Sequence, residues 1–460
     1  MACVRGTPGL GRNPGSGPVL RTLRARGSVL LNWFKPRRYR HFDLPVNEAF
    51  ARKVMDPASV SRHGFSPLIH YTKTERRYKK CSTTGERKIT QKERPIKYAA
   101  HRDACILSYY SNQINQALDA RYKAMGISDN IIAYRSLGLG NYDSAAEAMD
   151  FARKAAPVVI LAFDITSFFD SLDHALLKKR LKSLLGVYEL ADDWYKVFRF
   201  ITRFHYVDFE ELKAHPVFGQ RLKEKTRNRI ASMEELKKER IAFRANPELA
   251  NGHPRGIPQG TPISAALSNL YMMEFDKAAQ AACDRVSAFY RRYSDDILIV
   301  CKPEDELTIK NKILCLISDE KLEIVPDKTE QTLFEIGRPI PRTTKAAQYL
   351  GFTFDESGAA IRESSLARQW RKMRRAVRRA RKSARWRAKA GLFGKIHTKK
   401  LYRRFSYIKV YDGVSLRTLR NFSSYGRRSA AVFGSNEKIT RQVKRFEQAT
   451  LREIAKLKML

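Results

Sequence analysis

The sequence predicts a mixed α+β fold in which an antiparallel sheet packs on helices. Three segments carry this prediction: a strand at 158–164, a loop and helix at 254–270, and a β-hairpin at 288–300. The strand and the hairpin are rich in apolar and β-branched residues, which is typical of buried strands. With 460 residues, of which 43% are hydrophobic, the chain can bury a sizeable core.

The first of these strands ends in a carboxylate. Residues 158–163 form a continuous apolar run, and Asp164 follows it directly. An Asp at the end of a buried strand is costly unless it is paired, hydrogen-bonded or bound to a metal ion. Asp164 is therefore a candidate metal ligand. The alternative role, a helix N-cap or turn residue, suits Asp170 or Asp173 better.

The second segment combines a loop with a helix. Gly and Pro residues punctuate the loop at 254–262, and the apolar periodicity after Ser264 indicates a helix. A glycine-rich turn that enters a helix lets the backbone approach a nucleotide closely. An ordinary loop-to-helix junction has the same pattern, so this segment taken alone decides little.

The hairpin carries two adjacent carboxylates at its turn. Tyr293-Ser294-Asp295-Asp296 separates two apolar runs. Neighbouring carboxylates repel each other unless a cation lies between them, and a divalent metal ion relieves that repulsion. A surface turn with two Asp residues is the plain alternative for this tetrapeptide taken alone.

In this order, the motifs resemble those of a reverse transcriptase. The matching blocks are Asp164-x-x-x-x-Phe169, Pro258-Gln259-Gly260 and Tyr293-x-Asp295-Asp296. Three further segments match at the family's positions, namely 87–96, 326–329 and 348–352. The resemblance covers about residues 60–355 and implies a right-hand polymerase fold.

The resemblance divides the chain into three parts. Residues 1–32 are a basic arm rich in Gly, Pro and Arg that we expect to be disordered, although a transit peptide has the same composition. Residues 33–355 are expected to form fingers and palm, with an antiparallel palm sheet packed on helices. Residues 356–460 are expected to form a basic helical thumb that binds RNA. The charged segment 203–250 is interpreted as an elaboration of the palm with helical character.

Family roles transfer to the residues at matching positions. Asp164, Asp295 and Asp296 match the metal-binding triad, with the backbone carbonyl of Ile165 as a further ligand. The resemblance implies two Mg²⁺ ions, with Mn²⁺ as the alternative, that activate a primer 3′-hydroxyl and stabilise the leaving pyrophosphate. Such ions prefer carboxylates combined with substrate phosphate oxygens, so few protein ligands are expected.

The resemblance also assigns contacts with the incoming dNTP. Lys88 and Arg94 match the pair that contacts the triphosphate, with solvated surface charge as the alternative. Gln259 matches the residue beside the nucleotide, and Lys328 lies in the lysine-bearing motif that follows the hairpin. Phe169 matches the position that crowds the sugar 2′-hydroxyl and thereby favours dNTP over rNTP. Its alternative is core packing, with Phe168 and Phe169 alternating in and out at a strand end.

Positive charge is concentrated in the last hundred residues. The whole chain has 88 Lys and Arg against 47 Asp and Glu, a net charge of +41 that suggests a polyanionic partner. Residues 361–460 contain 30 Lys and Arg against 5 Asp and Glu. The stretch 369–382 predicts a helix with cationic faces. Interleaved aromatic residues are candidates for stacking on bases, although packing in the helix core is the expected role of most: Trp370, Trp386, Tyr402, Phe405, Tyr407 and Tyr411. The candidate nucleic-acid contacts are Arg371, Arg374, Arg375, Arg378, Arg379 and Lys382.

Cysteine usage and hydropathy favour a cytoplasmic protein. The six Cys residues include no Cys-x-x-Cys pair, which indicates reduced thiols and no zinc site. No apolar run approaches the length that spans a membrane, so no membrane partner is expected.

The finer resemblance is to bacterial defence-associated reverse transcriptases, through the fingers segment 98–111 and the basic C-terminal region. It implies cDNA synthesis on a dedicated, neighbouring noncoding RNA in antiphage defence, with template RNA, dNTPs and cDNA as partners. Two alternatives stay open. One is a group II intron or retron-type reverse transcriptase or maturase, although the Val-Thr-Gly triplet usual in retron thumbs is missing. The other is a non-catalytic RNA-binding protein on a polymerase fold, against which the intact Asp triad argues.

Overall fold

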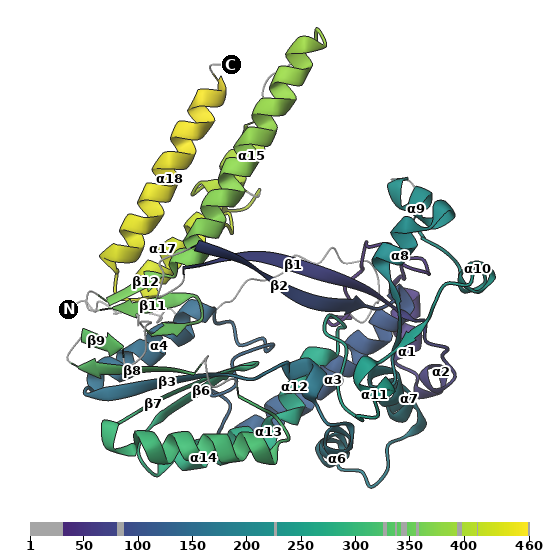
Figure 1. Ribbon diagram of the computed structural model, residues 1–460, viewed down its shortest axis with the longest axis horizontal. Coiled ribbons are helices and arrows are strands. Elements are labelled where there is room, and N and C mark those ends of the chain that lie inside the picture. The colour runs from purple at the N-terminus through teal and green to yellow at the C-terminus, as the bar shows by residue number, and fades with distance from the viewer. Residues whose placement is uncertain are drawn as a thin grey trace, which may run out of the picture.

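A computed structural model describes nine stretches of the chain, which are residues 31–80, 87–224, 228–324, 329–335, 338–341, 347–355, 358–392, 398–411 and 413–458. The predicted basic arm lies almost wholly outside the described residues. Within them, the chain combines antiparallel sheets with helices, and this confirms the predicted α+β class (Figure 1).

A five-stranded antiparallel sheet forms the centre of the palm, with the strand order β6-β7-β3-β8-β9. Its strands are β3 (Val158–Asp164), β6 (Phe289–Tyr293), β7 (Asp296–Cys301), β8 (Glu330–Glu335) and β9 (Arg338–Pro341). The predicted buried strand and β-hairpin are therefore confirmed. Because β3 lies in the middle of the sheet, both of its edges are paired and its apolar run is buried.

Alternate residues of β3 face two different hydrophobic cores, as the period of a strand requires. Val159, Leu161 and Phe163 belong to one core, and Val158 and Ile160 belong to the other. The helices of the first core are α12 (Ser264–Tyr271), α13 (Met273–Asp284) and α14 (Glu306–Asp319), and α4 (Asn141–Lys154) belongs to the second. Figure 1 shows α13 and α14 beneath the sheet, α4 above it and α12 beside its end.

The fingers are built on a second sheet. Its strands are β1 (Leu68–Lys80), β2 (Arg87–Tyr98), β4 (His205–Asp208) and β5 (Arg244–Ala245). β1 and β2 form a long antiparallel ribbon that extends towards α15 (Glu363–Lys389) of the thumb in Figure 1. The helices in this half of the molecule are α1 (Glu48–Val54), α2 (Pro57–Ser61), α3 (His101–Ala124), α5 (Phe168–Ser171), α6 (His174–Leu185), α7 (Asp192–Thr202), α8 (Phe209–Ala214), α9 (Pro216–Lys223), α10 (Met233–Lys238) and α11 (Pro247–Ala250).

The interpretation of segment 203–250 as an elaboration of the palm is wrong. Its strand β4 pairs in parallel with β1, and β5 pairs with β4, so the segment extends the sheet of the fingers. Leu212, Phe218 and Leu236 of its helices pack in one core with Ile69 of β1. Helical character is confirmed by α8, α9 and α10. Position along the chain gave the wrong neighbour because strand pairing is decided by non-local contacts.

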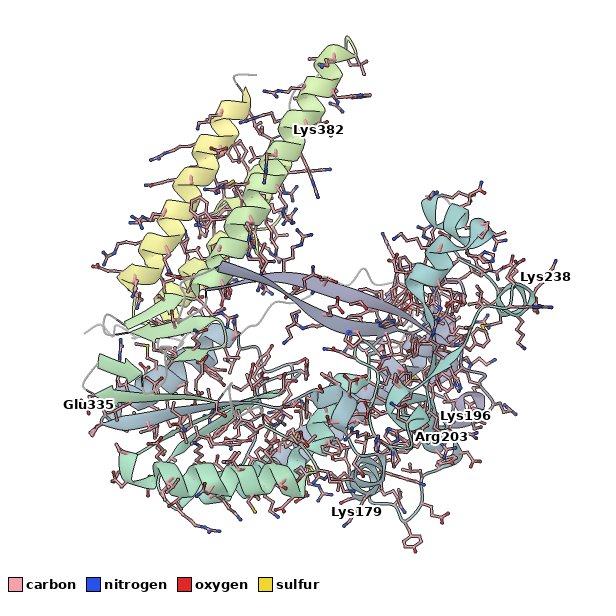
Figure 2. All side chains as sticks on the ribbon, viewed as in Figure 1. Lys179, Lys196, Arg203, Lys238, Glu335 and Lys382 are labelled. Atoms are coloured by element: carbon pink, nitrogen blue, oxygen red, sulfur yellow. The ribbon has the colours of Figure 1, made fainter. Side chains whose placement is uncertain are left out.

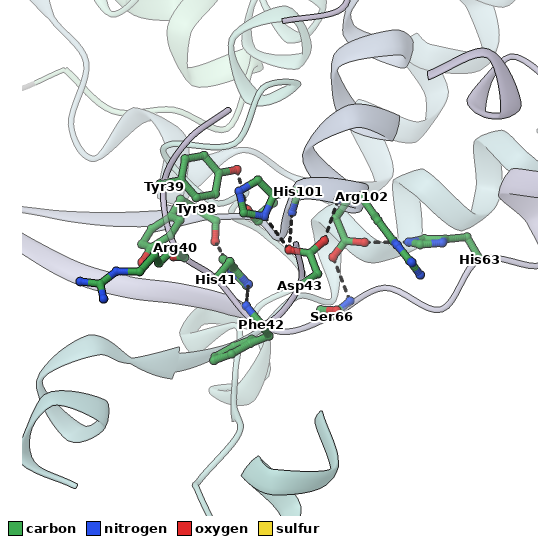
Figure 3. Close-up of polar contacts among 12 residues, drawn as sticks. Tyr39, Arg40, His41, Phe42, Asp43, His63, Ser66, Tyr98, His101 and Arg102 are labelled. Carbon is green, nitrogen blue, oxygen red and sulfur yellow. Dashed lines mark hydrogen bonds and ion pairs between the residues drawn. The ribbon is translucent and has the colours of Figure 1, made fainter. Parts of the chain in front are cut away.

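The segment before α1 is fixed to the start of α3 by polar contacts (Figure 3). The backbone N–H groups of His101 and Arg102 donate to the two carboxylate oxygens of Asp43, each at 2.8 Å. The His101 Nδ1 lies 2.8 Å from the same carboxylate. Asp43 thus satisfies the free N–H groups in the first turn of α3 from a distant part of the chain, in place of a local N-cap side chain.

The C-terminal region combines a small sheet with a helical bundle. Figure 1 shows α15 and α18 side by side, projecting away from the palm. Met373 and Val377 of α15 pack against Phe446 of α18 in a separate core. The elements are β10 (Gln348–Tyr349), β11 (Phe352–Asp355), β12 (Gly358–Ile361), α15 (Glu363–Lys389), α16 (Lys399–Phe405), β13 (Lys409–Tyr411), β14 (Leu416–Thr418), α17 (Phe422–Val432) and α18 (Glu437–Lys458). Among the helices of the described residues, none has the length and apolar character needed to cross a bilayer.

Candidate active site

The end of β3 and the start of β7 bring two carboxylates together. In the antiparallel pairing of these strands, Asp164 lies opposite Asp296. Residues opposite each other in such a pair have Cβ atoms about 4.5–5.5 Å apart and face the same side of the sheet. The fold therefore brings together two residues that are separated by more than a hundred positions in the sequence.

A two-residue turn between β6 and β7 carries the third carboxylate. Tyr293 pairs with Asp296, so Ser294 and Asp295 form the turn. Ser294 has a φ of 61°, in the left-handed region that hairpin turns of this length require. The backbone carbonyl of Asp295 accepts a hydrogen bond of 3.3 Å from the N–H of Ile165, which fixes the turn against the end of β3.

The electrostatic environment disfavours simultaneous ionisation of these carboxylates. Burial raises the pKa of Asp295, and the negative charge of Asp164 raises it further. Burial also raises the pKa of Asp296 to about 7, with further contributions from Asp295 and Asp164. Solvent still reaches the Asp296 side chain, so a ligand can approach it. A cation bound between the carboxylates would compensate both the lost hydration and the repulsion.

The oxygen donors present fit a hard divalent cation. In the described part of the chain, no group of three or more His, Cys, Asp or Glu side chains is gathered closely enough to hold a metal ion by itself. Mg²⁺ is commonly held by one or two carboxylates together with phosphate oxygens of the substrate. Asp164 and Asp295 can supply that share of the ligands.

Two cations act on the carboxylates from outside the palm sheet. Lys92 lies in β2 of the fingers, and Arg362 directly precedes α15. Their positive charges oppose the rise in the pKa of Asp296. The Nη1 of Arg362 donates to Oε1 of Gln348 at 3.5 Å, which connects the start of α15 to the segment 348–352 that matches the family. Sequence reasoning missed both cations, although Lys92 lies within the basic match at 87–96.

A buried ion pair supports the turn from behind. Arg292 is fully buried, and its Nε and Nη2 donate to the two carboxylate oxygens of Asp276 on α13, each at 2.7 Å. The Nη1 of Arg292 donates to the backbone carbonyl of Ser294 at 3.0 Å. The hydroxyl of Tyr290 donates to the same Asp276 carboxylate at 2.6 Å. Asp276 therefore orients Arg292, and Arg292 holds the turn that carries Asp295.

The predicted loop and helix are confirmed, and the loop joins the palm to the fingers. Helix α12 begins at Ser264, whose hydroxyl donates to the carbonyl of Pro258 at 2.6 Å. The carbonyl of Gln259 accepts a 2.8 Å hydrogen bond from the N–H of Lys97 on β2. Gly260 has a φ of 114°, and a Cβ at this position would lie 2.8 Å from the Lys97 carbonyl oxygen. The close approach of the two backbones therefore requires glycine.

Phe168 and Phe169 lie in a short helix, so the expected alternation at a strand end is wrong. Ser167 has a φ of 44°, and this left-handed residue turns the chain out of β3 before α5 begins. Phe168 is buried in the core. Phe169 is half-buried, and its carbonyl accepts a 2.8 Å hydrogen bond from the N–H of Ile257. Phe169 thus lies directly beside the Pro-Gln-Gly loop.

The other predicted nucleotide contacts are only partly described. Lys328 lies outside the described residues, and Lys88 lies in β2 with its side chain outside the description. Arg94 in β2 is partly exposed, and its Nη1 lies 3.5 Å from Oε1 of Glu75 on β1. Contact of these three residues with a triphosphate stays a prediction.

The predicted cationic helix is confirmed as α15. Met373 and Val377 face the bundle core, and most charged side chains of the helix are exposed. Trp370 packs against this core, as expected, and the Arg374 guanidinium lies 5.6 Å from its ring centroid. Lys382, labelled in Figure 2, lies further along α15. The exposed side chains include all six predicted contacts: Arg371, Arg374, Arg375, Arg378, Arg379 and Lys382.

Comparison with known proteins gives a family match over part of the chain. Residues 204–354 match the family described as "Reverse transcriptase (RNA-dependent DNA polymerase)". The matched segment contains Gln259, Asp295 and Asp296 and begins after Asp164. This partial match supports the predicted class of enzyme, an RNA-directed DNA polymerase.

Individual similar proteins are distant. Over 106 residues, the chain is 28% identical to the retron Mx162 reverse transcriptase of Myxococcus xanthus, and the match covers 21% of this chain and 22% of that protein. Another similar protein is the telomerase of Candida albicans, solved in complex with a fragment of telomeric RNA. Its match has a TM-score of 0.41 at 13% identity and covers 89% of this chain and 58% of the telomerase chain. An apo telomerase of Candida tropicalis, truncated from its C-terminal domain, has a TM-score of 0.39 at 11% identity and covers 64% of this chain and 56% of its own.

Proposed function

We propose that this protein is an RNA-directed DNA polymerase that synthesises cDNA by nucleotidyl transfer at Asp164, Asp295 and Asp296. The observation that carries this proposal is the in-register pairing of Asp164 with Asp296 beside the turn that holds Asp295. Burial and the charge of Asp164 raise the pKa of Asp295, and burial together with Asp295 and Asp164 raises that of Asp296, as occurs when acidic residues share a site that a cation would neutralise. The match of residues 204–354 to the reverse transcriptase family supports the same reaction.

Two Mg²⁺ ions, or Mn²⁺ in their place, would be held by the three carboxylates and the carbonyl of Ile165. When bound, such ions lower the pKa of a primer hydroxyl and neutralise charge on the pyrophosphate that leaves. The protein's own part is to hold the carboxylates at one end of β3 and β7. The hydrogen bond from the N–H of Ile165 to the carbonyl of Asp295 fixes the turn against β3. The Arg292 guanidinium binds the carbonyl of Ser294 and holds the turn from behind.

The incoming dNTP would lie between the palm and the fingers. Lys88, Arg94 and Lys328 would bind the phosphates, because a guanidinium fork and ammonium charges suit phosphate oxygens. Gln259 would lie beside the nucleotide, at the point where its loop is bound to β2. Phe169 would exclude the 2′-hydroxyl of an rNTP, and its half-buried position next to that loop supports this role.

The template would be an RNA bound along the exposed cationic side chains of α15. We propose a dedicated noncoding RNA and a role in antiphage defence, for which the support is the resemblance of segment 98–111 and the basic C-terminal region. A retron-type reverse transcriptase is the second candidate, because the identity over 106 residues is to a retron enzyme. Sequencing of the cDNA product would separate the two, since the template identifies the system.

The site assignment is tested by dNTP incorporation on an RNA template annealed to a DNA primer. Replacing Asp295 and Asp296 together with Asn keeps the shape of the turn and removes both charges. We expect incorporation to fall by at least about a thousandfold, since the metal ions would lose their ligands, while RNA affinity changes little. Incorporation by the double variant at the wild-type rate would refute the site.

A further inference from the structure

A small hairpin in the C-terminal region exposes apolar side chains to solvent. Strands β13 and β14 form this hairpin between α16 and α17. Tyr411 is 66% exposed, Val414 is 60% exposed and Leu416 is 67% exposed. We name Lys409, Tyr411, Val414 and Leu416 the hairpin surface. Three large apolar side chains that are exposed to solvent on one hairpin indicate a surface that binds a partner.

The strand register places Lys409, Tyr411 and Leu416 on one face. Tyr411 lies opposite Leu416, and Lys409 lies opposite Thr418. Because strand side chains alternate with a period of two, Lys409 and Tyr411 point to the same side of the hairpin. An aromatic ring, an aliphatic side chain and an ammonium group therefore share one small platform.

The hairpin is fixed to the bundle at its base. The side-chain Nδ2 of Asn421 donates to the carbonyls of Arg403 and Ser406, at 3.1 and 2.6 Å. The hydroxyl of Ser423 donates to the carbonyl of Phe405, which is buried in the bundle core. The hairpin surface is thus presented by a defined support, as a recognition element needs.

The charge around the hairpin selects among partners. Between residues 398 and 432, the sequence contains nine Lys and Arg and a single acidic residue, Asp412. The Arg427 guanidinium lies 4.4 Å from the ring centroid of Tyr407, near the start of the hairpin. A second copy of this chain, with its net charge of +41, would be repelled. A polyanion that also offers flat apolar faces matches both properties.

We propose that the hairpin surface binds unpaired bases of RNA. Exposed bases stack on aromatic side chains, and neighbouring cations bind the phosphates that join them. Bases in a duplex are stacked within the helix and hide these faces, so the surface would discriminate single-stranded segments from duplex. This inference rests on the proposed function, to which it adds a site that reads RNA structure apart from the phosphate contacts of α15.

The test compares two pairs of exposed residues. One variant carries Tyr411→Ser with Leu416→Ser. The matched control carries Tyr188→Ser with Leu307→Ser. Tyr188 is 88% exposed and lies in the other half of the molecule, and Leu307 is 67% exposed and lies on α14. The probes are a fluorescent, unstructured RNA of about 12 nucleotides and a duplex of the same length, a size within the range of single-strand sites. The affinity of each protein for each probe is measured by anisotropy.

We expect the hairpin variant to lose about tenfold in affinity for the single strand, in line with the loss of one stacked base, and to keep its affinity for the duplex. The control should match the wild type with both probes. Equal losses with both probes, or no loss with either, would overturn the proposal. It would also fall if light scattering showed a wild-type dimer that the hairpin variant breaks, because the surface would then bind a second copy.

The hairpin proposal and the proposed function can fail separately. The single-strand affinity is measured without dNTPs or a metal ion, so its result does not depend on whether the protein polymerises. If the wild-type protein incorporates no dNTP, the proposed polymerase activity is refuted. If the hairpin variant nevertheless binds the single strand more weakly than the wild type does, the proposed RNA site stands.

Discussion

At the scale of single residues, the geometry of the acidic turn depends on Arg292. This guanidinium is buried, and it joins Asp276 on α13 to the backbone of Ser294 in the turn. A buried charge that loses its partner carries the full cost of its lost hydration. The pair is therefore expected to contribute to both stability and the position of Asp295.

Replacing Arg292 with Met should lower the free energy of unfolding by about 3–5 kcal/mol, because Asp276 would keep a buried and uncompensated charge. Denaturation in urea, followed by circular dichroism, measures this change. The combined variant Arg292→Met with Asp276→Leu removes both charges and should recover most of the lost stability. Its dNTP incorporation should stay low, because the carbonyl of Ser294 has lost its donor. A single variant as stable as the wild type would contradict this account.

The sequence indicates candidate site residues most directly where they lie within short motifs. Asp164 follows an apolar run, and Asp295 and Asp296 are neighbours, so local patterns indicate them as candidates. Arg292 and Asp276 are both visible in the sequence, but nothing local shows that their side chains meet. Lys92 and Arg362 escaped notice for the same reason, since they approach the carboxylates only after fingers, palm and thumb have folded.

At the scale of elements, α15 is expected to hold RNA through charge. Its exposed cations surround only a narrow apolar stripe, of which Met373 and Val377 are the buried members. Each phosphate neutralised by such a helix releases counterions, so the affinity of the protein should fall steeply with salt.

Replacing Arg374, Arg375, Arg378 and Arg379 with Glu should weaken RNA binding and flatten its dependence on salt. The slope of log affinity against log salt should become less negative by about 0.7–0.9 for each phosphate contact that is lost. A filter-binding titration over a range of salt concentrations measures this slope.

The matched control reverses the same number of charges on the opposite side of the palm, at Lys277, Lys302, Lys310 and Lys312. Its salt slope should stay close to that of the wild type, apart from a small long-range effect. If the two variants change the slope equally, net charge controls binding and α15 is not the RNA site.

Elements with strong local patterns were predictable, and pairing between them was not. The apolar runs of β3 and β7 and the periodicity of α12 and α15 are visible over a few turns or residues. The assignment of segment 203–250 failed because β4 pairs with β1, more than a hundred residues away. The error at Phe168 has a local cause, since the left-handed Ser167 ends the strand and the apolar pattern does not reveal it.

At the scale of the whole molecule, three separate parts of the fold surround the acidic site. Asp164, Asp295 and Asp296 come from the palm, Lys92 from the fingers ribbon and Arg362 from the start of α15. Burial opposes the lowered pKa of Glu75 on β1, which Arg94 and Lys73 lower most, and the charge of Arg368 on α15 contributes to it, so the ribbon and the thumb lie within electrostatic reach. An extended polyanion could therefore contact all three parts at once.

The most direct test of the central claim is incorporation of labelled dNTP by the purified protein together with its co-purifying RNA. We predict DNA synthesis that depends on Mg²⁺ or Mn²⁺, disappears after RNase treatment and is absent from the Asp164→Asn variant, whose side chain keeps its size but loses its charge. No synthesis by a wild-type protein that still binds its RNA tightly, or synthesis that survives RNase treatment, would contradict an RNA-directed polymerase.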